Sequence, residues 1–279
     1  MDFTIKQLHT IEELEVFSQL EFAIWGEEPI PVHQTSTVAK NGGIILGGYV
    51  DNCLVGILYS FPGMKKGSIY LCSHILGFLP EYRGKGYGEL MKEKQREIAL
   101  QQGYDLITWT FDPLESANAN LNIGKLKGVC RQYIENCYGD SDDILSVGLP
   151  TDRFLVELYI DSEHVKTSRS FKQVEAKRIF EISRTEGGYP VVTGFCQKVL
   201  ENLETEGAVA VTMPTTFQQM KKDDFSLAKE WRFKTREMFN RLFSHSFVVV
   251  DTVRDLMNET QDYVLVKQEQ VQIDFKGKK

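Results

Sequence analysis

Apolar and polar residues alternate at the start of the chain and then change to a helical spacing. Residues 3–8 alternate with a period of two, which predicts a short strand with one buried face. Thr10 and Glu13 have the spacing of a capping box, so a helix is expected to begin after Thr10. Its apolar side chains recur at helical spacing, at Leu14, Phe17, Leu20 and Ile24. The N-terminus therefore predicts a strand followed by an amphipathic helix.

Apolar runs then predict the strands of a buried sheet. Residues 43–50 and 54–61 are separated by residues 51–53, a connection short enough for a hairpin. Further runs of strand-forming residues occupy 68–79, 105–111 and 153–160. Helices are expected at 89–102 and 118–127, closed by Gly103 and Gly128. Strands that alternate with helices in this order predict an α/β fold of the α+β type with a mixed sheet.

The C-terminal part of the chain has a periodicity of its own. Residues 163–173 are polar and are expected to be a linker or crossover. Strands are predicted at 208–213, 247–252 and 263–267, and a helix capped by Asp224 has one apolar stripe, made of Leu227, Trp231, Met238 and Leu242. We therefore predict two domains, 1–162 and 163–279. The second is a smaller α/β region whose order resembles half of the first, a degenerate half-repeat, and its stripe packs on its own strands as support or as a homodimer surface.

Composition narrows the class of protein. The 279 residues are 42% hydrophobic and 25% charged, and no apolar run has the length of a membrane span. The N-terminus has no signal-peptide pattern, so a cytoplasmic location is expected. The five cysteines are scattered without a C-x-x-C pair, which predicts free thiols and no metal site. A net charge of −7 argues against a nucleic-acid partner.

The segment Arg83-Gly84-Lys85-Gly86-Tyr87-Gly88 lies between a predicted strand and a predicted helix. Its glycines let backbone N–H groups converge at a helix N-terminus, which favours an anion such as a pyrophosphate. A Walker loop would need Ser or Thr after Lys85, and a dinucleotide-binding turn would need G-x-G-x-x-G, so neither pattern fits. A flexible surface turn is the alternative that six residues alone leave open.

The same segment resembles the Arg/Gln-x-x-Gly-x-Gly/Ala loop of the GNAT N-acetyltransferase superfamily. The order of elements over residues 1–162 is similar too, and the whole chain resembles a long, two-part bacterial subgroup of mostly unassigned substrate. The resemblance implies that the loop binds the phosphates of acetyl-CoA or another acyl-CoA. It further implies that the pantetheine arm lies along the preceding strand. The residues so implicated are Leu76, Gly77, Phe78, Arg83, Gly84, Lys85, Gly86, Tyr87 and Gly88.

Acyl transfer to an amine needs a base, a donor to the oxyanion and an acid for the leaving thiolate. The backbone N–H near Leu76 is the expected oxyanion donor. His74 lies two residues upstream, on the same strand face by the period of two, and is the expected base; the alternative is a hydrogen-bonded core histidine. Asp112 is expected to orient His74, to bind the amine or to act as the base through water, unless it only initiates an Asp-Pro turn.

The remaining site residues follow from the resemblance. Asn118 corresponds to an asparagine that touches the CoA arm, or is simply a helix N-cap. The tyrosine that protonates the thiolate in many relatives falls on Gly124 here, and Tyr133 and Tyr138 are the nearby substitutes. Trp25 and Arg153 are expected in the acceptor pocket, where Arg153 binds a carboxylate or pairs with an acid.

These residues predict a CoA-dependent N-acyltransferase without a metal. It moves an acetyl or succinyl group to the amine of a small molecule such as an amino acid. A non-catalytic CoA-binding module whose C-terminal region binds a protein, and a protein N-acetyltransferase, are the alternatives.

Overall fold

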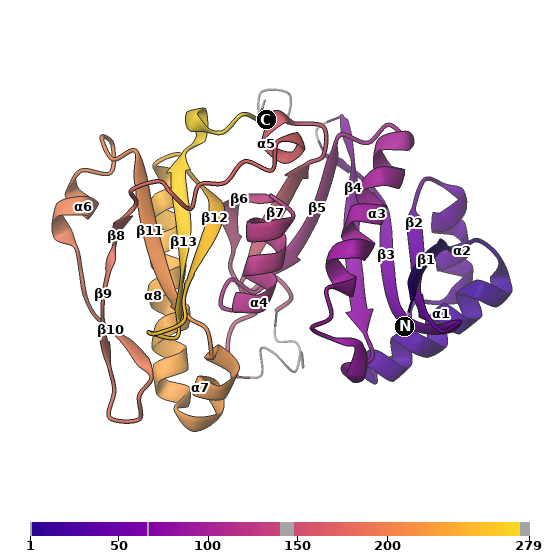
Figure 1. Cartoon of the computed structure of the whole chain (residues 1–279), viewed down its shortest axis with the longest axis horizontal. Coiled ribbons are helices and arrows are strands. Elements are labelled where there is room, and N and C mark those ends of the chain that lie inside the picture. The colour runs from indigo at the N-terminus through magenta and orange to yellow at the C-terminus, as the bar shows by residue number, and fades with distance from the viewer. Residues whose placement is uncertain (1, 66, 140–147, 274–279) are drawn as a thin grey trace. The chain divides into compact units, whose positions relative to one another are not determined.

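The computed structural model describes residues 2–65, 67–139 and 148–273. They form two compact units, whose elements are labelled in Figure 1. The N-terminal unit comprises the residues up to Trp109 together with Leu158–Ser162, and the C-terminal unit comprises Thr110–Glu157 and Glu163–Ile273. The division differs from that expected from the sequence, because Thr110–Glu157 group with the C-terminal residues. A domain boundary at residue 162 remains a prediction.

The N-terminal unit has a sheet with strand order β1-β2-β3-β4-β5, in which only the β4–β5 pair is parallel. The last two residues of β5 belong to the C-terminal unit. The elements are β1 (Phe3–Gln7), α1 (Ile11–Trp25), α2 (Val32–Lys40), β2 (Ile44–Val50), β3 (Cys53–Lys65), β4 (Ser68–Phe78), the 3₁₀ turn η1 (Pro80–Tyr82), α3 (Tyr87–Gln101) and β5 (Leu106–Phe111).

The local signals of this unit act as the sequence predicts. The capping box is present, because Thr10 Oγ1 accepts from the backbone of Glu13 and the Glu13 carboxylate accepts from that of Thr10. Asp51 and Asn52 have positive φ angles, as a two-residue hairpin turn requires. Helix α2 was not predicted, since its nine residues are mostly polar and no side chain caps its N-terminus.

Helices cover both faces of the N-terminal sheet. Ile45, Ile57 and Tyr59 point to one face, where they form a core with residues of α1. The residues that alternate with them point to the other face, which α3 covers. At Gly48 of β2, for example, an added Cβ would lie 3.4 Å from the sulfur of Met91 on α3. The two faces of β3 and β4 therefore have different surroundings, α1 and α2 on one side and α3 on the other.

The C-terminal unit contains a sheet with order β7-β6-β12-β13-β11-β8 and a separate β9–β10 ribbon. Its elements are α4 (Ser116–Ala119), the π-helical turn η2 (Asn120–Lys125), β6 (Val129–Ile134), β7 (Arg153–Tyr159), α5 (Glu163–Lys166), β8 (Lys177–Arg178), β9 (Phe180–Arg184), β10 (Pro190–Phe195), α6 (Gln197–Glu201), β11 (Ala208–Pro214), α7 (Phe217–Asp223), α8 (Phe225–Ser244), β12 (Phe247–Asp255), β13 (Thr260–Lys267) and η3 (Gln268–Gln270).

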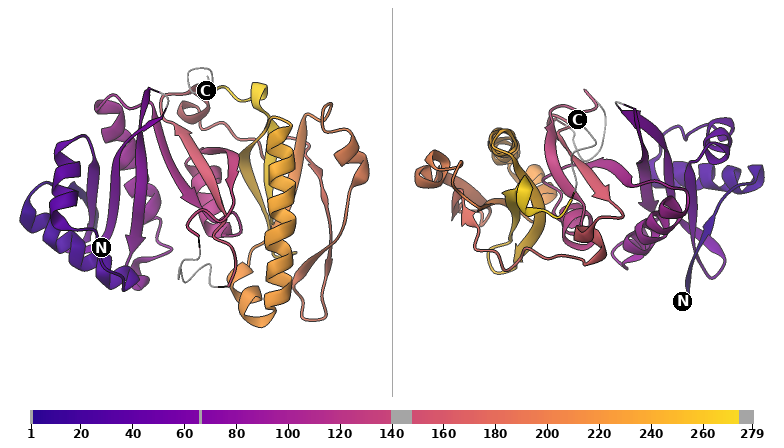
Figure 2. Two further views of the ribbon diagram at one scale, coloured as in Figure 1. Left: turned by 180° about the vertical axis from the view of Figure 1, so that it is seen from behind. Right: turned by 90° about the horizontal axis from the view of Figure 1, so that it is seen from above.

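Helix α8 lies along one face of this sheet (Figure 2). Asp224 caps it, accepting from the backbone N–H of Leu227 at 2.9 Å. The apolar stripe is buried in its own chain, which confirms the prediction that it packs on the unit's own strands: Leu227, Trp231, Met238 and Leu242 are all below 9% exposed. Trp231 Nε1 donates to the carbonyl of Pro190 on β10 at 3.0 Å.

Two local predictions in this region are correct only in part. The segment 163–173 is not simply a linker, since it contains α5 and three buried side chains, His164, Val165 and Phe171. The helix expected over 118–127 begins at Ser116 and widens into a π-helical turn, so Asn118 lies inside it and is not its cap. The positive φ angle that ends it belongs to Lys127, not to Gly128. Within the described ranges, no helix combines the length and apolarity needed to cross a membrane.

Candidate functional site

The glycine loop connects η1 to the N-terminus of α3. Gly84 and Gly86 have positive φ angles of 72° and 82°, and a Cβ at either position would contact nothing within 4 Å. Backbone conformation, not crowding, therefore requires glycine here. Gly86 is the N-cap of α3, and no side chain caps it. The first N–H groups of a helix have no partner inside it. Here they lie beside an exposed loop, an arrangement that suits the binding of an anion.

The side chains of the loop divide into anchored and exposed ones. Arg83 Nε donates to the carbonyl of Phe78 at 2.9 Å, which ties the loop to the end of β4. The Tyr87 ring stacks on Phe3 with 4.0 Å between centroids, so this residue offers the loop only its backbone. Lys85 is exposed and lies 5.0 Å above the Tyr82 ring. The loop thus presents backbone N–H groups with two cations beside them.

Strand β4 separates from β5 after two residue pairs. Leu71 pairs with Ile107 and Cys72 with Thr108, and within the described residues the pairing ends there. The backbone of residues 73–78 on that edge of β4 is therefore open to a ligand. Leu76, Gly77 and Phe78 lie on this stretch, as the sequence predicts for residues along the acyl arm.

The side chains of this stretch are packed against the protein. A Cβ on Gly77 would lie 2.3 Å from the Trp25 ring, so Trp25 covers that glycine from α1. Phe78 is buried against Phe3 and Tyr87. At Gly77 and Phe78, therefore, this edge offers a ligand backbone groups and not side chains.

His74 is the extra residue of a β-bulge. Tyr59 pairs with Ile75 and Ser60 pairs with Ser73, so His74 has no partner on β3. Bulges redirect side chains and occur often beside functional sites. The expectation that His74 shares a face with Leu76 was wrong. His74 points to the face of α1 and α2, whereas Leu76 pairs with Leu58 on the other face, because the bulge interrupts the period of two.

A groove of about 930 Å³ opens beside His74. Tyr59, Phe61 and Pro62 line it from β3. The other lining residues come from the α1–α2 connection, α2 and its C-cap: Glu28, Pro29, Ile30, Pro31, Gln34, Thr37, Val38 and Asn41. The His74 ring contacts the Tyr59 and Phe61 rings edge-on, with ring centroids 6.3 and 6.0 Å apart. Desolvation by these neighbours lowers the pKa of His74 below its ordinary value, so its imidazole is neutral at pH 7.

The wall of the groove is held by a buried carboxylate. Glu21 on α1 accepts from the backbone N–H of Ile30 at 3.2 Å, which fixes the α1–α2 connection. Burial raises the pKa of Glu21, although this hydrogen bond opposes the shift. Sequence reasoning missed α2 as a groove wall; the proline pair Pro29 and Pro31, which cannot continue a helix, was the available signal.

Asp112 lies in the C-terminal unit, where its carboxylate is engaged. Oδ2 forms a buried ion pair with Arg232 of α8, and Arg153 Nη1 lies 3.8 Å from the same oxygen. Oδ1 accepts from the backbone N–H of Leu114 at 2.9 Å, the hydrogen bond of an Asx turn. The turn alternative is therefore confirmed. Arg153, for which an ion pair was the alternative to an acceptor carboxylate, is buried and pairs with Asp112.

The other expected residues of the C-terminal unit are also accounted for. Tyr133 is buried and donates to Asp152 Oδ2 at 2.8 Å; its burial raises the pKa of this phenol, which opposes ionisation. Asn118 is exposed on α4. A Cβ on Gly124 would lie 3.0 Å from Thr252 Oγ1 of β12 and 3.1 Å from Asn120 Oδ1, so a side chain at this position would require one of these two to shift.

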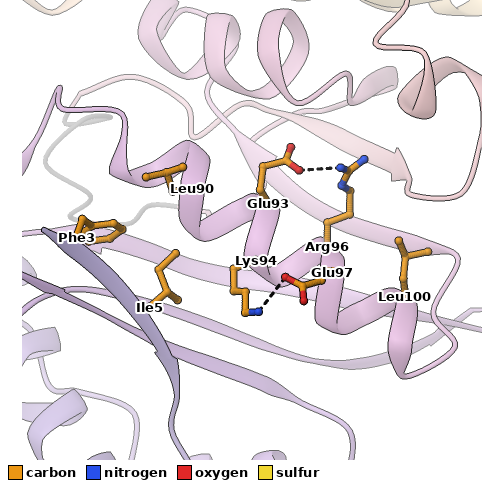
Figure 3. A pocket seen from close by; sticks show the side chains of 8 residues that line it. All are labelled: Phe3, Ile5, Leu90, Glu93, Lys94, Arg96, Glu97 and Leu100. Carbon is orange, nitrogen blue, oxygen red and sulfur yellow. Dashed lines mark hydrogen bonds and ion pairs between the residues drawn. The ribbon is translucent and has the colours of Figure 1, made fainter.

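A second hollow of the N-terminal unit lies between β1 and the outer face of α3 (Figure 3). Phe3, Ile5, Leu90 and Leu100 line it. Its charged residues pair along the helix, Glu93 with Arg96 and Lys94 with Glu97, each at 2.8 Å. The hollow therefore presents no uncompensated charge, unlike the glycine loop. Among the residues the structure describes, no group of three His, Cys, Asp or Glu side chains is arranged to hold a metal ion.

Residues 8–121 match the model of the acetyltransferase (GNAT) family. This stretch is a GNAT acetyltransferase domain. It contains the His74 groove, β4 and the glycine loop, and its match ends in the π-helical turn η2. No curated protein matches the chain at a significant level.

Solved structures resemble the chain over somewhat more than the GNAT domain. A GNAT-family acetyltransferase from Streptococcus pneumoniae is 13% identical over 56% of this chain and 98% of its own, with a TM-score of 0.45. Naa50 from Arabidopsis thaliana, in complex with the bisubstrate analogue CoA-Ac-MVNAL, is 16% identical over 56% of this chain and 98% of its own, also with a TM-score of 0.45. The ribosomal-protein-S18-alanine N-acetyltransferase from Escherichia coli is 14% identical over 57% of this chain and 94% of its own, with a TM-score of 0.46.

Proposed function

We propose that the protein is an acyl-CoA-dependent N-acyltransferase that transfers an acetyl or succinyl group to the primary amine of a small molecule such as an amino acid. The observation that carries this proposal is the position of His74. Its neutral imidazole, directed by a β-bulge, lines a groove of about 930 Å³ in the same unit as the glycine loop. Grooves of this size suit small ligands.

In this reaction each group of the GNAT domain has a task. The N–H groups around Gly84 and Gly86, with Arg83 and Lys85, hold the pyrophosphate, and the open edge of β4 pairs with the arm. The amine enters as an ammonium ion, which the Glu28 carboxylate attracts, and His74 accepts its proton. The neutral nitrogen then attacks the thioester carbon, and a backbone N–H near Leu76 stabilises the oxyanion.

A non-catalytic CoA-binding module is the second candidate. It is favoured by Gly124, a crowded glycine at the position of the tyrosine that serves as the acid in many relatives. The two candidates differ in turnover, since only the enzyme releases free CoA in proportion to an added amine.

The test is an amine panel assayed for thiol release from acetyl-CoA and succinyl-CoA, with mass spectrometry of the product. We expect amine-dependent release with at least one donor. Glu28→Gln should raise the KM for the amine about tenfold and leave CoA affinity unchanged, because about 1.4 kcal/mol of attraction is lost. Glu27→Gln, next to it but outside the groove lining, is the control. CoA binding without turnover for any amine would favour the non-catalytic module.

A further inference from the structure

A buried lysine lies behind β4, on the face opposite the His74 groove. Lys92 of α3 is 4% exposed, and its Nζ donates to Ser73 Oγ at 2.8 Å. The same Nζ lies 3.8 Å from the centroid of the Trp109 ring on β5. Gln95, one turn further along α3, also donates to Ser73 Oγ, at 3.0 Å. Side chains of α3, β4 and β5 thus meet around one serine hydroxyl.

The charge of Lys92 is not balanced by an acid. In the part of the chain that the structure describes, no carboxylate lies within ion-pair distance of it, and the Trp109 ring is its main electrostatic contact. Burial therefore lowers the pKa of Lys92 to about 7, and the Cys72 thiol of β4 opposes that shift. Trp109 on β5 and Gln95 on its own helix do not titrate. Lys92 can gain or lose a proton near neutral pH.

The Ser73 hydroxyl accepts two hydrogen bonds from this cluster and keeps its own proton to donate. A serine oxygen has two acceptor sites and one O–H donor, and both acceptor sites are used by Lys92 and Gln95. Its own O–H proton stays available, because the hydrogen bonds of the described residues include no acceptor for it. Two further buried atoms here have no partner among the described residues, Gln95 Oε1 and Trp109 Nε1. Buried polar groups are usually hydrogen-bonded, so this cluster has hydrogen-bonding capacity to spare.

The hydroxyl lies where β4 and β5 separate. Ser73 directly follows Cys72, the last β4 residue that pairs with β5, and directly precedes the bulge at His74. An acyl arm that runs along β4 from the glycine loop, past Phe78 and Leu76, reaches this point with its thioester end. The departing sulfur and the Ser73 hydroxyl then meet at the same position.

We propose that Ser73 and Lys92 form a proton relay to the thiolate that leaves during acyl transfer; this rests on the proposed function. As the tetrahedral intermediate collapses, the C–S bond breaks and its electron pair stays on sulfur. The Ser73 O–H proton moves to that sulfur, and an N–H proton of Lys92 moves to the serine oxygen. Lys92, now a neutral amine, regains a proton from solvent, so the proton that His74 removed from the substrate balances the overall reaction.

The relay supplies a general acid for the leaving thiolate, which Gly124 has no side chain to provide. It also separates the two proton transfers by the sheet itself, since His74 faces α2 and Ser73 faces α3. Ser73 is the group that contacts the leaving sulfur, and Lys92 is a positioning residue that acts through it.

The test is the pH profile of turnover in the full-length protein. The wild type should lose activity above about pH 7, as Lys92 becomes neutral. Lys92→Met, of similar length and without a charge, should lower kcat about 10²-fold or more and abolish that alkaline loss, since general-acid catalysis contributes roughly 10²- to 10⁴-fold. Lys94→Met, on the exposed face of the same helix, is the control and should keep the wild-type profile.

Two further variants distinguish proton transfer from charge or packing. Ser73→Ala should abolish the alkaline loss as Lys92→Met does, while the Kd of CoA measured by calorimetry stays within about twofold. Lys92→Arg keeps a charge but does not release a proton at these pH values, and it should not restore kcat.

The relay is refuted by a wild-type profile without an alkaline loss, by a Ser73→Ala enzyme with the wild-type profile, or by full activity in Lys92→Arg. A wild type that binds CoA but turns over no amine refutes the proposed function instead. In that case titration of the Lys92 amine by NMR, with and without CoA, still tests the cluster. A pKa of Lys92 that is the same with and without CoA would show that bound CoA does not lie close to Lys92.

Discussion

Ser73 and His74 are consecutive residues of β4, yet their side chains face opposite sides of the N-terminal sheet. Ser73 contacts Lys92 of α3, and His74 lines the groove beside α2. The bulge makes this possible, because it adds one residue to β4 between the partners of Tyr59 and Ser60. A base and an acid can therefore act at one point of the strand from different surroundings, which is how enzymes separate the pKa values of two catalytic groups.

The glycine loop can be tested with a matched pair of substitutions in α3. Gly86 and Gly103 lie just before and just after this helix with φ angles of 82° and 83°, and neither has an atom within 4 Å of an added Cβ. Valine at either position is expected to cost about 1–2 kcal/mol in backbone strain. Gly86→Val should also weaken CoA binding at least tenfold in calorimetry, whereas Gly103→Val should not. Equal CoA affinity in the two variants would contradict a phosphate site at the loop.

Replacing the proposed base should affect chemistry rather than binding. His74→Ala is expected to lower kcat by roughly 10²- to 10⁴-fold with an unchanged Kd for CoA. Because desolvation lowers the pKa of His74, the acidic loss of wild-type activity should lie below about pH 6.5, where the imidazole becomes protonated, and so be separate from the alkaline loss expected from Lys92. The variant should lack that acidic loss. Combined with Lys92→Met, which removes the alkaline loss, it should recover partly at high pH, where more of the amine is neutral. His33→Ala, exposed on α2, is the control; a His74→Ala enzyme of normal kcat but lower Tm would make His74 a structural residue.

Asp112 is expected to stabilise the C-terminal unit. Asp112→Asn leaves the buried Arg232 guanidinium without its carboxylate and should lower the free energy of unfolding by about 3–5 kcal/mol. Asp112→Leu combined with Arg232→Met should recover much of that loss, because no charge then stays buried unpaired. Denaturant unfolding measures both, with exposed Asp223→Asn as the control. A stable Asp112→Asn protein with a changed pH profile of turnover would instead support a catalytic Asp112.

The C-terminal unit should lose stability in mild acid through His164. Burial, and then the nearby cations Lys127 and Arg169, lower the pKa of His164 to about 4. An unfolded histidine binds a proton near pH 6.5, so the unfolded state binds more protons between these values and stability falls as the pH falls. The free energy of unfolding should fall by about 3 kcal/mol in total by pH 4. His164→Asn should flatten this slope in denaturant unfolding, and His245→Asn, at the exposed end of α8, should keep it.

Local signals made much of the N-terminal unit predictable. The capping box at Thr10, the Asp51-Asn52 turn and the glycine loop each depend on a few neighbouring residues, so the sequence alone specifies them. The stripe of α8 was predictable for the same reason, since helical spacing decides which side chains share a face. Helix α2 was missed because its sequence is mostly polar and tertiary contacts hold it in place.

The sequence by itself determined the residues of the glycine loop and the presence of a histidine on the strand before it. Only the tertiary structure decided where that histidine points, because one extra residue on β4 reverses the alternation from which the face was inferred. It also decided which distant groups meet. Lys92 reaches Ser73 across 19 positions, and Asp112 reaches Arg232 across 120. No local pattern encodes such contacts, since they form only when separate elements pack together.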